Sequence, residues 1–165
     1  MNVLVTYFSQ TGNTRKVAEA IFETIEGEKD IREFSNVDSL DDYGLTFVGF
    51  PMQAFGPAQQ AKEFLANFCQ GKEIALFLTH GVTEDFEELP RWLENCRQAA
   101  DGAEVVGMFD CQGEVAEFLL DAARESDDPL MQKLAGAGEE GKGQPDAKSL
   151  DEARAFAVDI MARYA

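Results

Sequence analysis

Residues 3–25, VLVTYFSQTGNTRKVAEAIFETI, place a strand, a polar turn and a helix in direct succession. Val3–Phe8 is apolar and β-branched, which is typical of a strand covered on both faces. The polar turn at Ser9–Asn13 is followed by apolar residues at helical spacing, as far as about Ile25. This succession predicts the first strand–helix unit of a parallel sheet.

The rest of the chain repeats this alternation of short apolar runs and amphipathic stretches. The second predicted strand is weak and typical of a sheet edge, and Pro51 is expected to stop the third. The further strands are expected at residues 31–34, 45–50, 73–79 and 103–109, and helices at 58–69, 90–100 and 114–124. Parallel neighbours need crossovers, so the pattern predicts an α/β fold with a five-stranded parallel sheet and helices on both faces.

A single domain is expected over residues 1–165, with one excursion at about 125–148. The excursion holds several glycines, two prolines and many acids, which predicts a flexible acidic surface segment. A solvated loop is favoured there over a lid. Ser149–Glu152 then has the pattern of a capping box and predicts the start of the last helix.

Composition narrows the possible functions. Against 14 Lys and Arg stand 31 Asp and Glu, so the formal net charge is −17, which opposes binding to nucleic acid or to anionic membranes. No apolar run approaches the roughly 20 residues that a membrane-spanning helix needs. No basic segment precedes the first strand, so no signal peptide is expected. We expect a cytoplasmic protein, with a monomer favoured.

The three cysteines are widely spaced and contain no C-x-x-C pair. Cys69 and Cys96 continue apolar helical patterns and are expected to be small buried hydrophobes. Cys111 is expected to be an inert buried thiol near the end of the fifth strand. The acidic pairs of the chain lack metal-loop spacing, and no metal site or catalytic residue is predicted.

The strongest functional signal is the turn after the first strand. Hydroxyl groups, side-chain amides and a glycine meet there at a helix N-terminus, where backbone N–H groups and the helix dipole favour a phosphate. The turn has neither the lysine of a nucleoside triphosphate loop nor the G-x-G-x-x-G pattern of a dinucleotide site. The candidate phosphate-binding residues are Ser9, Gln10, Thr11, Gly12, Asn13 and Thr14.

The pattern S-x-T-G-N-T after a first strand resembles the phosphate loop of flavodoxins, and the resemblance extends over most of the chain. Asp110–Gly113 after the fifth predicted strand, and an acidic last helix, are also similar to small members of that family. The resemblance implies a flavodoxin-like three-layer sandwich with strand order 2-1-3-4-5. It also implies FMN as the cofactor, with its phosphate in the loop at residues 9–14.

The same resemblance places the isoalloxazine ring between two further loops. Phe55-Gly56 stands where many flavodoxins carry Trp-Gly, so Phe55 is expected to cover a ring face, unless it belongs to the core. Gly56 is expected to let the neighbouring peptide turn by accepting positive φ. His80, the only histidine, either hydrogen-bonds within its loop or borders the ring. The candidate ring-binding residues are Pro51, Met52, Gln53, Ala54, Phe55, Gly56, Thr79, His80 and Gly81.

The resemblance and the charge together favour an FMN-binding protein that shuttles electrons between redox partners. A net charge of −17 suits transient docking to partner proteins with basic surfaces. The alternative is an FMN-dependent reductase of a quinone, a tetrapyrrole or a similar acceptor. A third class, an interaction protein that has lost its flavin, is opposed by the intact phosphate loop.

Overall fold

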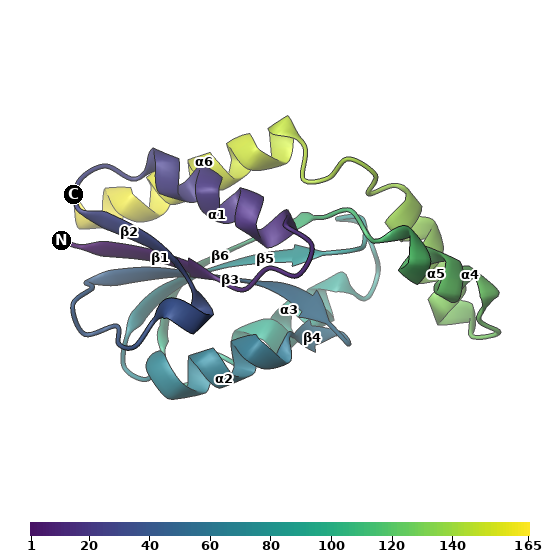
Figure 1. Cartoon of the computed structure of the whole chain (residues 1–165), viewed down its shortest axis with the longest axis horizontal. Helices are drawn as coiled ribbons and strands as arrows, with labels where there is room; N and C mark the ends of the chain where they lie inside the picture. The colour runs from purple at the N-terminus through teal and green to yellow at the C-terminus, as the bar shows by residue number, and fades with distance from the viewer.

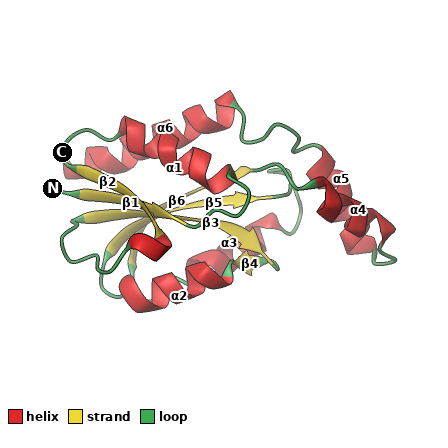
Figure 2. Ribbon diagram, viewed as in Figure 1, coloured by secondary structure: helices red, strands yellow, loops and turns green.

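The computed structural model describes residues 1–165 and shows one sheet between two layers of helices (Figure 2). The five parallel strands lie in the order β2-β1-β3-β5-β6. Because β5 and β6 are the fourth and fifth of these strands along the chain, this confirms the predicted order 2-1-3-4-5. They are β1 (Val3–Tyr7), β2 (Lys29–Glu33), β3 (Leu45–Gln53), β5 (Glu73–His80) and β6 (Glu104–Gln112). A two-residue strand, β4 (Gly56–Pro57), adds an antiparallel pairing to the end of β3.

Helices cover both faces of the sheet (Figure 1). One face is covered by α1 (Asn13–Thr24) and α6 (Ala147–Met161), and the other by α2 (Gln59–Phe68) and α3 (Leu89–Gln98). The crossover from β2 to β3 contains only a short 3-10 turn, Phe34–Asn36. Two further helices, α4 (Glu117–Glu125) and α5 (Pro129–Glu139), extend beyond the carboxyl ends of the strands.

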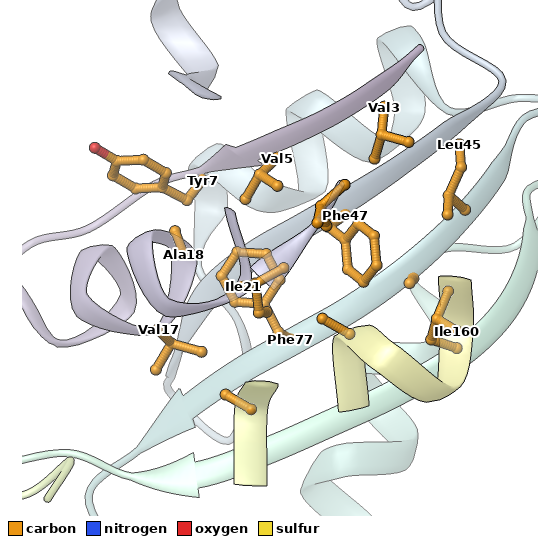
Figure 3. Packing of buried hydrophobic residues seen from close by; sticks show 14 of the residues in the cluster. Val3, Val5, Tyr7, Val17, Ala18, Ile21, Leu45, Phe47, Phe77 and Ile160 are labelled. Atoms are coloured by element: carbon orange, nitrogen blue, oxygen red, sulfur yellow. The ribbon is translucent and has the colours of Figure 1, made fainter. Parts of the chain in front are cut away.

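The core on the α1–α6 side is built from the central strands. Phe47 of β3 and Phe77 of β5 are fully buried against Ile21 of α1 and Ile160 of α6 (Figure 3). The three cysteines are free and buried as expected, and burial raises the pKa of each thiol to about 12. None of the helices is both long enough and apolar enough to span a bilayer.

Two strands are longer than expected at the end that carries the ligand loops. The expectation that Pro51 stops the third strand is wrong, because β3 continues through it to Gln53. Neighbouring β1 ends opposite Gly49, so beyond that point one side of β3 is an edge, where a proline without an N–H is tolerated. β6 likewise continues to Gln112, which pairs with His80.

The segment predicted as a flexible loop at 125–148 is largely helical, because it contains α5. The carboxylate of Asp128 caps this helix by accepting a hydrogen bond from Leu130 N at 2.9 Å, and proline suits its first position. α5 packs so closely on α4 that the position of Gly138 leaves no space for a side chain. A Cβ at Gly138 would come within 2.6 Å of the Leu120 side chain.

The cap of the last helix also differs from the expectation. Asp146, and not Ser149, caps α6, and its carboxylate accepts from Ser149 N at 2.9 Å. The helix therefore begins at Ala147, because the aspartate three residues upstream supplies the side-chain acceptor that the capping-box interpretation assigned to the serine.

We call residues 114–144, which contain α4 and α5, the α4–α5 hairpin. Its two ends meet where Glu114 N donates to Gln144 O at 2.8 Å. The buried amide of Gln112 donates to Ala137 O at 2.9 Å and so ties α5 to the end of β6. Side chains of α5 also pack on a small apolar cluster around Phe86 and Trp92, which fixes the hairpin beside the ends of the strands.

Candidate functional site

A polar hollow of about 260 Å³ lies at the carboxyl ends of the strands. The loops after β1, β3, β5 and β6 all contribute to it, at the switch point where a doubly wound sheet binds its ligands. From the predicted residues, the structure brings together Ser9, Gln10, Thr11, Asn13, Thr14, Pro51, Met52, Gln53, Thr79, His80 and Gly81. Gly12 and Gly56 line neither this hollow nor its neighbour.

The loop at residues 9–14 has the shape of an anion nest. Gly12 has a φ of +96°, and no atom lies within 4 Å of the position that its Cβ would take. The Ser9 hydroxyl accepts from Gly12 N at 3.1 Å and holds the turn closed. Asn13 and Thr14 begin α1, so their N–H groups have no acceptor within the helix and are free for a ligand.

Three side-chain hydrogen bonds join the loops around the polar hollow. Each connects the phosphate loop to a different neighbour, so the walls are held in place before a ligand enters. They are Gln53 Nε2 to Gln10 Oε1 at 2.7 Å, the buried pair Thr14 Oγ1 and Thr79 Oγ1 at 2.8 Å, and Asn13 Nδ2 to Glu114 O at 3.0 Å.

A second, apolar hollow of about 240 Å³ continues from the first. The two share five wall residues: Met52, His80, Gly81, Val115 and Leu119. The remaining walls are Ala54, Phe55, Val82, Trp92, Leu120, Ala123, Met131, Leu134 and Ala135. Ligand sites typically measure about 300–1,000 Å³, which neither hollow reaches alone and both reach together. The combined site suits a ligand with an anionic polar end and a flat apolar end.

Phe55 lies at the border of the apolar hollow and not in the core. Its ring stacks on Trp92, with centroids 4.7 Å apart, and 41% of the residue is exposed. The alternative that Phe55 is a core residue is therefore wrong. That Phe55 covers a ring face stays a prediction.

Gly56 itself does not adopt positive φ, and its role in letting the neighbouring peptide turn stays a prediction. The residues with positive φ are Ala54, at 49°, and Phe55, at 65°, whereas Gly56 pairs with Gln53 in the β3–β4 ladder. A type I′ turn, a common two-residue connection between antiparallel strands, has positive φ at both central residues, whatever side chains they carry. Asn95 of α3 holds the turn by donating to Phe55 O at 3.0 Å.

His80 closes β5 and is buried between the two hollows. Its Nε2 lies 2.8 Å from Asp110 Oδ2 and 3.4 Å from Glu84 Oε1. Burial opposes the charged imidazole, but the hydrogen bonds to Asp110 and Glu84 outweigh it and raise the pKa of His80 to about 9. Burial raises the pKa of Asp110, yet its bond to His80 leaves it below the usual value. His80 Nδ1 is buried without a hydrogen-bond partner.

Much of the apolar hollow was not foreseen from the sequence. The missing walls come from the α4–α5 hairpin, from Val82, which precedes α3, and from Trp92, which lies within α3. The motif at Asp110–Gly113 pointed to the loop after the fifth strand, and Gly113 does line the polar hollow. The helical spacing of the residues around 114–124 gave no sign of the surface on which they pack.

This geometry suits a ligand that carries a phosphate, at the switch point of a doubly wound sheet. The sequence matches the family model of the flavodoxin domain over residues 4–158. It is 32% identical, over 174 residues, to the flavodoxin-like domain-containing protein BilS of Clostridioides difficile, covering 98% of this chain and 97% of that relative. The chain belongs to the flavodoxin family.

Solved structures share the fold at lower identity. A flavodoxin from the domain Archaea has a TM-score of 0.61 and 22% identity, covering 99% of this chain and 98% of that one. General stress protein 14 of Treponema denticola, solved in complex with FMN, has a TM-score of 0.58 and 12% identity, covering 96% of this chain and 98% of its own. At these identities the likeness concerns the fold.

Proposed function

We propose that this protein binds FMN and carries electrons between redox partner proteins that have basic docking surfaces. The observation that carries the proposal is the continuity of the two hollows, which begin at an anion nest and end between apolar walls. FMN has the same sequence of parts: a phosphate, a polar ribityl chain and a flat ring. Membership of the flavodoxin family supports this assignment.

The residues present fit FMN. The N–H groups of Asn13 and Thr14 and the hydroxyl of Thr11 would hold the phosphate, and the apolar side chains of Met52 and Leu134 would flank the ring. No lysine or arginine lines either hollow, so the phosphate would be held by hydrogen bonds and the helix dipole. When bound, FMN supplies the redox chemistry, while the chain binds it, orients it and excludes water.

The net charge of the protein would affect the reduction potential of a bound flavin. A net charge of −17 disfavours further negative charge at the site, which lowers the reduction potential of a flavin that becomes anionic. The same charge raises the encounter rate with basic partners without requiring tight binding.

The purified protein is expected to carry FMN or to bind it one to one when it is added. Transfer of the ring into the apolar hollow should shift its visible absorption and change its fluorescence, because the ring leaves water and approaches Trp92. A titration followed by both signals measures the stoichiometry. Failure to bind FMN at micromolar concentration would contradict the proposal and favour an interaction protein without flavin.

Direct oxidation of NAD(P)H by the FMN-loaded protein is expected to be slow compared with reduction through a partner reductase. The sequence has no second nucleotide-binding fingerprint to hold the nicotinamide donor. Reduction through a partner should slow as salt is added, because the screening length falls to about 8 Å at physiological ionic strength. Stopped-flow absorbance measures both rates. Rapid turnover from NAD(P)H to a quinone or a tetrapyrrole by the isolated protein would favour the reductase alternative.

A further inference from the structure

The apolar hollow lies between the α4–α5 hairpin and the rest of the domain, which we call the body. Seven of the fourteen residues that line the hollow belong to the hairpin and lie between Val115 and Ala135. The other seven belong to the body and lie between Met52 and Trp92. A flat ring bound in this hollow would therefore have the hairpin on one side and the body on the other.

The hairpin is built as one stiff unit. α4 and α5 pack mainly on each other, and neither has a comparable contact with any other helix or strand. The Arg124 guanidinium of α4 also reaches the Glu139 carboxylate of α5, at 2.7 Å. Gly138 of α5 lies so close to the Leu120 side chain of α4 that the two helices leave no gap at this point. Any motion of the hairpin would therefore carry both helices together.

Two loops at the base of the hairpin form a suitable hinge. Residues 113–116 connect β6 to α4, and residues 140–146 connect α5 to α6. In Figure 1 the hairpin lies beyond the end of the sheet and is joined to the body through these two loops. Hinges in proteins consist of a few such residues in loops or at the ends of elements. The bond from Glu114 N to Gln144 O holds the two loops together, so the hairpin can turn about one point.

One lysine connects the hairpin to the body beside the apolar hollow. Lys133 Nζ of α5 lies 3.1 Å from Glu88 Oε2 and 3.7 Å from Glu87 Oε2. It also lies 4.6 Å from the centre of the Phe86 ring, which belongs to the apolar cluster on which α5 packs. Ion pairs at the surface are individually weak, because water competes for both charges. This connection can therefore break and form again without disturbing the fold.

We propose that the α4–α5 hairpin is a lid over the flavin ring, that it swings away from the body to admit and release FMN, and that Lys133 latches it shut. A closed lid excludes water from the ring and retains the cofactor, and lids of this kind move within microseconds to milliseconds. The inference rests on the proposed function, because it assigns the route by which FMN reaches its site.

A cross-link between the hairpin and the body tests the lid. Lys133→Cys with Glu88→Cys allows a short, flexible bismaleimide to join the two sides where the ion pair holds them. The three native cysteines are buried, and burial raises the pKa of each thiol to about 12, so the reagent should spare them. Exchange of bound, tritium-labelled FMN against excess unlabelled FMN should slow about tenfold or more on cross-linking.

A second cross-link is the matched control. Asp121→Cys with Glu139→Cys joins α4 to α5 inside the hairpin, where Arg124 binds both carboxylates. The same reagent then stiffens the hairpin without tying it to the body, so FMN exchange should change less than about twofold. Each cross-linked protein is compared with the same variant before the reagent is added.

Loss of the latch alone should favour the open lid. Lys133→Met keeps the apolar stem of the side chain and removes its charge, so FMN release should become about threefold faster. In the FMN-free protein, acrylamide should quench Trp92, the only tryptophan, more strongly, because α5 packs on the cluster that contains it. Lys142→Met removes an exposed lysine of the same hairpin that takes no part in these ion pairs, and it should change neither signal.

The outcomes separate the lid from the proposed function. Equal FMN exchange before and after the cross-link of residues 88 and 133 would overturn the lid and leave FMN binding intact, and so would equal slowing by both cross-links. Quenching of Trp92 that stays at the parent level in Lys133→Met would overturn the latch. A parent protein that binds no FMN would overturn the proposed function, and the lid with it.

Discussion

Gly12→Asp is expected to abolish FMN binding at micromolar concentration. Gly12 lies in the turn whose neighbouring N–H groups would hold the phosphate, so a carboxylate there would lie close to it. Two like charges at such a partly buried site repel by several kcal/mol, which is a loss of about a thousandfold or more in affinity. No neighbouring atom obstructs a side chain, because none lies within 4 Å of the Cβ position, and the φ of +96° strains every such substitution alike. A fluorescence titration with FMN measures the effect.

Two comparisons isolate the charge. Gly12→Asn has nearly the same shape, carries no charge and tolerates the positive φ of 96° better than most residues, so it should lose much less affinity. Riboflavin, which lacks the phosphate, should bind Gly12→Asp and the parent with similar affinity. If Gly12→Asp binds FMN as tightly as the parent, the phosphate site lies elsewhere.

The FMN-free protein is expected to lose about 2 kcal/mol of its free energy of unfolding between about pH 6 and pH 8.5. His80 has its pKa raised to about 9 in the folded protein, from 6.5 in the unfolded chain. Such a group contributes its full stabilisation below pH 6.5 and loses it as the pH rises through 9. Urea unfolding at the two pH values measures the difference.

The other titrating groups at this site can be separated from His80. Asp110 has a lowered pKa, so its share of the stability is lost only under acid conditions, below its usual value of 3.8. Burial raises the pKa of Glu84, so its ionised carboxylate costs stability. This cost sets in as the pH rises above the usual pKa of 4.5. His80→Gln keeps a donor for Asp110 and should flatten the dependence between pH 6 and 8.5. An unchanged slope in that variant would show that another group titrates.

The sequence predicts the parts of this molecule whose signals are local. The strand, turn and helix at residues 3–25 are contiguous, and the free N–H groups at a helix N-terminus follow from helix geometry alone, so the phosphate loop could be located without a structure. The strand order followed from the alternation of strands and helices together with the resemblance. Buried thiols at Cys69 and Cys96 followed from apolar helical spacing.

The parts that the sequence missed depend on contacts between distant segments. Gly136 and Gly138 weaken a helix locally, yet α5 forms because Gly138 allows close packing on Leu120. The two hydrogen-bonding partners His80 and Asp110 are 30 residues apart, and a register shift between Ile74 and Ala75 helps to decide which residues of β5 and β6 lie side by side. No pattern in either strand shows such a shift.

The turn after β3 was missed for a different reason. Positive φ is expected at glycine or asparagine, so the sequence points to Gly56. The tight pairing of Gln53 with Gly56 instead imposes positive φ on Ala54 and Phe55. Their conformation follows from the hairpin and from the Asn95 hydrogen bond of α3, and not from their own preferences.

The closed base of the α4–α5 hairpin makes it an exchangeable module in the evolution of the protein. Glu114 N bonds to Gln144 O at 2.8 Å, so the excursion leaves and re-enters the domain at one point. The entropic cost of closing such a segment grows slowly with its length. Descendants of this chain can lengthen, shorten or replace the hairpin while the sheet and the phosphate loop stay intact. Selection can therefore reshape the outer surface and the apolar wall, provided that the base of the hairpin keeps the hydrogen bond from Asn13 to Glu114 O.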